Sequence, residues 1–190
     1  MATVFFMIWK CASHIDQTRL EKKEREAKLE EGNCMFDSAD LTGMVIDNYG
    51  VPIKPIEKLS YLRKHYPESL SHISNKDSLS EGQVVRISNT EVTLSVKNDS
   101  ARITKIIIDL SSEFQLNLKG KETINCNYSL DDLRAAFPQS YNCRETFLVT
   151  NRTENVIVRL DNADKDGKLE FMLLYFSFME KLYQVEFVYD

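Results

Sequence analysis

"SLDDLRAAFPQS", residues 129–140, repeats the pattern of "KLSYLRKHYPES", residues 58–69. At an offset of 71 positions the two stretches share two leucines, an arginine, an aromatic residue, a proline and a serine. Leucines three residues apart lie on one face of a helix, and proline does not continue a helix, so each stretch predicts a short helix that ends before Pro67 or Pro138. Any short amphipathic helix shares part of this pattern, but the full match favours one structural unit used twice.

Short segments typical of strands surround both predicted helices. In the first half they are "GMVIDNYGVPI", "QVVRI", "EVTLSV" and "ITKIIIDL", and in the second "EFQLNLKGKETI", "ETFLVT", "VIVRL", "KLEFMLLYF" and "LYQVEFVY". Several alternate apolar and polar residues, and turn-forming residues separate them. We therefore predict an α+β fold of two tandem units, residues 44–112 and 113–190, each with a short helix packed on an antiparallel β-sheet.

Residues 1–43 differ in character from the rest of the chain. Residues 16–31, "DQTRLEKKEREAKLEE", are strong helix formers with acid-base pairs three and four apart, which predicts an exposed charged helical arm. Before it, six apolar residues, Val4–Trp9, precede Lys10 and Cys11. They are shorter than the usual apolar part of a secretory leader and have no cationic region before them. Two interpretations stay open: a leader with lipid attachment at Cys11, or an ordinary buried strand or helix start.

The charge balance restricts the partners that we expect. The formal net charge is −5 and the pI is about 5.3, with lysines and arginines scattered among acids. Nucleic-acid binding depends on clustered cations, so we do not expect it, and a protein partner with a basic surface is easier to accommodate. No run of about 18 apolar residues is present, so no transmembrane helix is expected.

The four cysteines show no CxxC spacing, and the three histidines lie far from them in sequence. Cys126 and Cys143 bracket the second predicted helix, where a disulfide would stabilise by about 3 kcal/mol in the entropic model. We expect this disulfide if the protein is exported and two buried thiols if it is cytosolic.

No cofactor or metal is expected. The stretch "NADKDGKLE", residues 162–170, places acids and a glycine as a calcium-binding EF-hand loop does, but Leu173 stands where the loop needs a glutamate. A hairpin turn explains the same residues. There is no phosphate-binding glycine loop and no GxSxG or HExxH motif, and His72 lies in a polar, serine-rich stretch, so we do not expect an enzyme.

Aromatic residues are concentrated near the C-terminus, in "FMLLYFSFMEKLYQVEFVY", residues 171–189. Most of them should fill the core between sheet and helices. A strand has only two faces, so some large apolar side chains of "FMLLYF" should lie on the face away from the helices. An exposed patch of this kind is typical of a protein interface.

The order of elements resembles the repeat of beta-lactamase inhibitor protein and of related small bacterial outer-membrane lipoprotein domains. The features that carry the resemblance are the strand with Gly43 before the first helix, the Ser-Leu-x-x-Leu helix start and the final "KLYQVEF" strand. Bacterial toxin-immunity proteins are built in a similar way, and residues 116–140 resemble them most. Several members have two helices per repeat, whereas this sequence predicts one.

The resemblance implies a non-enzymatic protein-binding module, most concretely a bacterial immunity protein that neutralises a toxin by steric binding. The alternative is an envelope-anchored structural or assembly lipoprotein. A periplasmic or membrane-anchored location is expected ahead of a cytoplasmic one. The expected partner contacts lie on the second-half loop and the strands beside it: Arg159, Asp161, Asn162, Asp164, Asp166, Glu170 and Tyr175.

Overall fold

The computed structural model describes residues 32–46, 50–73, 82–109, 113–121, 123–150, 153–163 and 169–190. The predicted arm at 16–31, the predicted lipidation site Cys11 and the loop residues Asp164 and Asp166 lie outside these ranges. The chain divides into two compact units, Met1–Met35 and Phe36–Asp190. All the helices and strands named below belong to the second unit.

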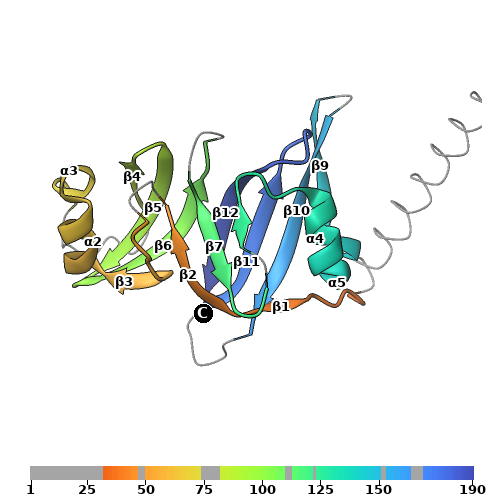
Figure 1. Ribbon diagram of the computed structural model, residues 1–190, viewed down its shortest axis with the longest axis horizontal. Coiled ribbons are helices and arrows are strands. Elements are labelled where there is room, and N and C mark those ends of the chain that lie inside the picture. Colours follow the sequence, from red (N-terminus) through yellow and green to blue (C-terminus); the bar gives the residue numbers. More distant parts are fainter. Residues whose placement is uncertain are drawn as a thin grey trace, which may run out of the picture. The chain divides into compact units, whose positions relative to one another are not determined.

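Within the described ranges, nine strands form a large sheet that is antiparallel except for the pairing of its first strand (Figure 1). Its strands are β1 (Ser38–Ala39), β3 (Ile56–Lys58), β4 (Gln83–Ile87), β5 (Thr90–Lys97), β6 (Ser100–Ile107), β9 (Glu145–Thr150), β10 (Thr153–Asn162), β11 (Leu169–Phe176) and β12 (Leu182–Tyr189). The order is β1-β10-β11-β12-β6-β5-β4, with β3 also beside β6 and β9 also beside β10.

Strand β6 joins the two halves of the chain. It pairs with β5 along one edge, and its other edge is divided between β3, at Ser100–Arg102, and β12, at Lys105–Ile107. The predicted units 44–112 and 113–190 therefore contribute strands to the same sheet.

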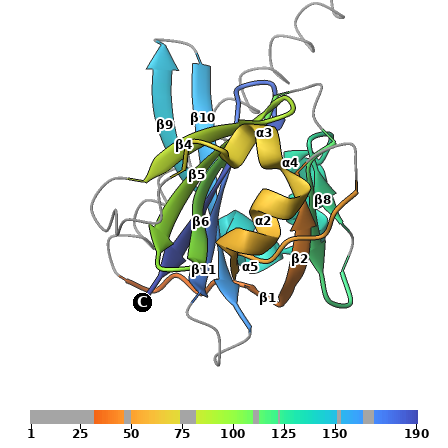
Figure 2. The same ribbon diagram turned by 90° about the vertical axis from the view of Figure 1, so that its left-hand side faces the viewer.

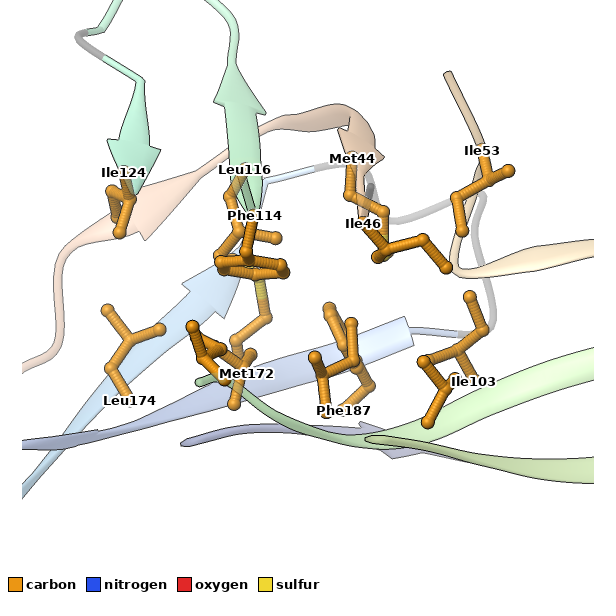
Figure 3. Packing of buried hydrophobic residues seen from close by; sticks show 14 of the residues in the cluster. Met44, Ile46, Ile53, Ile103, Phe114, Leu116, Ile124, Met172, Leu174 and Phe187 are labelled. Atoms are coloured by element: carbon orange, nitrogen blue, oxygen red, sulfur yellow. The ribbon is translucent and has the colours of Figure 1, made fainter. Parts of the chain in front are cut away.

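A second, three-stranded sheet covers part of one face of the large one. It contains β2 (Leu41–Val45), β7 (Gln115–Leu118) and β8 (Ile124–Asn125) in the order β2-β7-β8, so it too combines strands from both halves. Figure 3 shows the small sheet and adjoining segments directing apolar side chains toward the large one. The labelled residues on the small-sheet side are Met44, Ile46, Ile53, Phe114, Leu116 and Ile124, and those opposite are Ile103, Met172, Leu174 and Phe187. The core is continuous across the two layers.

The described ranges contain four short helices, in two consecutive pairs: α2 (Leu59–His65) with α3 (Pro67–Leu70), and α4 (Leu130–Ala136) with α5 (Pro138–Asn142). Figure 2 shows α2 and α4 on the side of the large sheet where β2 and β8 lie. The mixed α+β class predicted from the sequence is confirmed. The prediction of one helix per half is wrong, because proline is well tolerated at the first position of a helix, and Pro67 and Pro138 each begin a second one.

The two longer helices are capped in different ways. At α4, Ser129 and Asp132 form a capping box: the Ser129 hydroxyl accepts from the Asp132 N–H at 3.2 Å, and the Asp132 carboxylate accepts from the Ser129 N–H at 2.9 Å. At α2 the carboxylate comes from Asp99, in the turn between β5 and β6, which accepts from the Ser60 N–H at 2.9 Å and hydroxyl at 2.8 Å. One cap is local, and the other closes a contact across 39 residues.

Substituting both capping acids should change how stability depends on pH. Hydrogen bonds from the serine hydroxyls, then from the backbone N–H groups, lower the pKa of Asp99 and of Asp132 from the usual 3.8. A lowered folded-state pKa stabilises the protein above the unfolded pKa, and this contribution disappears as pH falls through the folded value. We expect Asp99→Asn/Asp132→Asn to lower Tm at neutral pH and to approach the unsubstituted protein at acidic pH. A Tm difference that stays constant throughout the titration would contradict this.

Truncating a side chain between the sheets should destabilise the whole fold. Phe114 is fully buried, so Phe114→Ala should reduce the free energy of unfolding by about 3–5 kcal/mol through lost burial and a residual cavity. Val84→Ala, at a position 55% exposed on the edge strand β4, is the control and should change it by less than about 0.5 kcal/mol. Urea denaturation measures both, and equal effects would show that Phe114 is not part of a close-packed core.

Candidate protein interface

The large sheet has one covered face and one face that no described helix or strand covers. In β10, β11 and β12 alternate residues are buried under the helices and the small sheet, so the residues between them point the other way. We call this second surface the open face. Its members in the second half and on β6 include Ile157, Arg159, Asp161, Phe171, Leu173, Tyr175, Gln184, Glu186, Lys105 and Ile107.

Strand register sets the order of side chains on the open face. One row runs Arg159, Leu173, Glu186 and Lys105 across four strands. The next row runs Ile157, Tyr175, Gln184 and Ile107 across the same strands. Neighbouring strands lie about 4.8 Å apart, so each row is a continuous line of contacts that mixes apolar and charged groups.

Glu186 is the centre of a polar network on this face. Its carboxylate accepts from the Tyr175 hydroxyl at 2.7 Å and from the Gln184 amide at 2.9 Å, and the Lys105 ammonium lies 3.7 Å away. Burial, together with the hydrogen bond to Glu186, raises the pKa of Tyr175 above its usual 10.0. Tyr175 thus stays a neutral hydrogen-bond donor at physiological pH, and the network holds its ring in one orientation.

Arg159 is also held in place. Its guanidinium carbon lies 4.0 Å from the centre of the Phe171 ring and 4.8 Å from that of Phe36, and its Nε donates to Asp161 at 2.6 Å. Stacking on aromatic faces and a carboxylate partner restrict a side chain that otherwise has many rotamers. About a third of the Arg159 side chain remains exposed, at 33%. It is a preorganised cation at the surface.

The structure brings three of the predicted contact residues, Arg159, Asp161 and Tyr175, onto the open face. Asn162 has a structural contact instead: its amide donates to the Leu169 carbonyl at 3.0 Å and ties β10 to β11. Glu170 is exposed at the irregularity in the β11–β12 register. Asp164 and Asp166 lie outside the described residues.

The predicted disulfide between Cys126 and Cys143 is not present, because no two described cysteines lie at disulfide distance. The prediction took the chain between them as one helix whose flanks return. In the structure Cys126 precedes α4, and Cys143 follows the additional helix α5, which carries the chain onward. Cys143 is buried and Cys126 half-buried.

Sequence reasoning missed the most exposed apolar residues of the second half. It assigned most C-terminal aromatics to the core, but Phe178 and Met179, in the turn between β11 and β12, are 55% and 66% exposed. On β9, Phe147 and Leu148 are 38% and 66% exposed. The available signal was a turn, "SFMEK", with large apolar residues where small polar ones are usual.

Two kinds of feature are absent from the described residues: a group of possible metal ligands and a helix able to span a membrane. No three His, Cys, Asp or Glu side chains are grouped there so that they could hold a metal ion. None of the helices in the described ranges is long and apolar enough to span a membrane.

No protein-family model, no curated protein and no solved structure matches this chain. The resemblance to beta-lactamase inhibitor protein therefore remains an expectation from the sequence.

Removing one hydroxyl should test the network around Glu186. Tyr175→Phe should lower the free energy of unfolding by about 1.5–3 kcal/mol, the usual range for a hydrogen bond to a charged group. In the Glu186→Gln background the same substitution should cost less, because the charged acceptor is gone. A double-mutant cycle by urea denaturation gives the coupling energy, and purely additive effects would mean that the pair contributes nothing in solution.

Proposed function

We propose that this protein is a non-enzymatic binding protein that neutralises or regulates another protein, with the open face as its contact surface. The observation that carries the proposal is the arrangement of that face: half-buried apolar side chains alternate with charged groups already held by neighbours. Protein interfaces combine these two kinds of group, with aromatic residues and arginine enriched at their centres. Leu173, Tyr175 and Arg159 are the residues that we expect to contribute most.

We further propose that the two halves are copies of one unit. Helices α2 and α4 have the same length and begin 71 residues apart, and an aromatic residue follows each. Tyr66 and Phe137 adopt nearly the same backbone conformation, with φ/ψ of −128°/56° and −137°/65°, before a proline that begins the next helix. Such local agreement supports duplication, and it leaves function to the surfaces in which the halves differ.

The most concrete form of the proposal is a toxin-immunity protein. The overall charge of −5 suits a basic partner, since complementary charge speeds the encounter and discriminates against other partners. Inhibition would be steric: the sheet covers the functional site of the toxin without chemical change in either protein. A rigid sheet is well suited to this task, because few side chains have to be ordered on binding.

Co-expression with a toxin encoded by the neighbouring gene tests the proposal. We expect restored growth and a complex on size-exclusion chromatography. Leu173→Glu should weaken the complex about 100-fold, because it places a carboxylate in the middle of the contact surface.

Gln139→Glu is the matched control, with the same new charge at an exposed position of α5, on the covered side of the sheet. It should leave affinity within about threefold. Circular dichroism verifies that both variants fold. Absence of both protection and complex would refute the immunity function, and equal affinity of both variants would refute the open face as the contact surface.

A further inference from the structure

The turn between β11 and β12 has a defined and rigid geometry. The Ser177 N–H donates to the Lys181 carbonyl at 2.9 Å, and the Glu180 N–H donates to the Ser177 carbonyl at 2.8 Å. Glu180 has a φ of 59°, in the left-handed region that favours glycine. Phe178 and Met179 are the two residues at the tip, and more than half of each is exposed.

Contacts with the segment before α4 hold this turn in place. Lys181 forms a backbone bridge with Ser129, and its ammonium donates to the Asn127 carbonyl at 3.3 Å. The tip is therefore fixed by the body of the protein, and little conformational entropy would be lost when it is bound.

The tip is part of a larger apolar surface. Figure 1 shows the β9–β10 hairpin and the β11–β12 connection at the same end of the large sheet. Phe147, on β9, lies opposite Asn155, whose amide donates to the Tyr183 hydroxyl at 3.3 Å, just beyond the turn. We call this surface the apolar end. It consists of Phe147, Phe178 and Met179, while Leu148 points to the other face of β9.

The apolar end adjoins the open face through one pair of rings. Tyr183 meets Tyr175 edge-on, with ring centres 6.3 Å apart. A partner that covers Tyr175 can therefore reach the turn without leaving the surface.

The fold gives no reason for apolar residues at the tip. Turn positions are usually Gly, Asn, Asp, Pro or Ser, which supply the backbone geometry and remain hydrated. Phe178 and Met179 provide neither a turn preference nor core packing. Two adjacent exposed apolar side chains at a rigid tip match the anchor residues that enter pockets in protein interfaces.

Charges around the apolar end identify the kind of partner. Glu180 and Lys181 lie in the turn itself, and Asp131 and Asp132 lie in the first turn of α4, which the bridge to Lys181 brings beside it, so three acids accompany one lysine. This acidic surround disfavours an anionic lipid surface, which attracts lysine and arginine. It also disfavours a second copy, whose acidic end would be repelled. It suits a partner protein with basic residues around an apolar pocket.

We propose that the turn Ser177–Lys181 anchors the interface, with Phe178 and Met179 inserted into an apolar pocket of the partner protein and the acids around them paired with a basic rim. This inference rests on the proposed binding function and adds to it the chemistry of the partner. The open face provides most of the contact area, and the turn provides the anchor residues that fix the position of the partner protein.

The first experiment places a photo-reactive p-benzoylphenylalanine at position 178 of the full chain, expressed in its native cells and irradiated. We expect a cross-link to one protein other than this chain, and the same substitution at position 139, exposed on α5, should not give that product. A lipid adduct, a cross-linked dimer of this chain or no product would each overturn the proposal.

The second experiment measures affinity for the purified cross-linked protein. Phe178→Ser/Met179→Ser should weaken binding about 100-fold, as expected for the loss of two anchor residues, while Gln139→Ser, at an exposed position of α5, stays within about threefold. The association rate of the unsubstituted protein should fall steeply with added salt. If Leu173→Glu weakens binding but the double substitution does not, the anchor is refuted and the open face stands. If neither variant changes affinity, both proposals fail.

Discussion

The architecture depends on the pairing of β6 with β12. Only three residue pairs form it, Gln184 with Ile107, Val185 with Ile106 and Glu186 with Lys105, yet it makes one sheet from the two halves. Val185 and Ile106 are fully buried, so a slip by one residue would expose them and bury two charged groups. The Tyr189 hydroxyl, 2.6 Å from the Ile103 carbonyl and 3.0 Å from the Pro55 carbonyl, holds the end of β12 against the first half.

This register also determines what the outer surface can do. With the helices and the small sheet on one side, the alternate residues of β10, β11 and β12 on the other side contact one another, Lys105 of β6 and Phe36. The Glu186 carboxylate accepts hydrogen bonds from Tyr175 and Gln184 and pairs with Lys105. The Arg159 guanidinium lies against the rings of Phe36 and Phe171. Groups satisfied in this way keep their positions without a ligand, which is what a surface needs if binding is to cost little entropy. The apolar end extends this surface where the strands run past the covering helices.

Long-range polar contacts connect parts that the hydrophobic core alone would leave free to shift. Asp99 caps α2 from a distant hairpin, and Asp37 exchanges two hydrogen bonds with the fully buried Ser140, at 2.8 and 2.9 Å. In the first half of the chain, Ser69 occupies the position that corresponds to Ser140 in the pattern of the two stretches. The helices that carry the repeated sequence pattern are thus held by different partners: Asp99 caps α2, whereas Asp132 caps α4.

Much of the fold could be predicted from the short-range preferences of the sequence. Segments typical of strands located β4, β9 and β12 at their observed bounds, and the leucine spacing located α4, because strand and helix periods depend only on nearby residues. The second helix of each pair, which begins at Pro67 or Pro138, was not predicted. A proline can end one helix and begin the next, and whether the second helix forms depends on what it packs against. The aromatic residues concentrated near the C-terminus predicted an interface, but the sequence did not show which of these rings would be buried. Strand order, the separation of Cys126 from Cys143 and the exposure of Phe178 all follow from contacts between residues far apart in the chain, and local sequence does not encode such contacts.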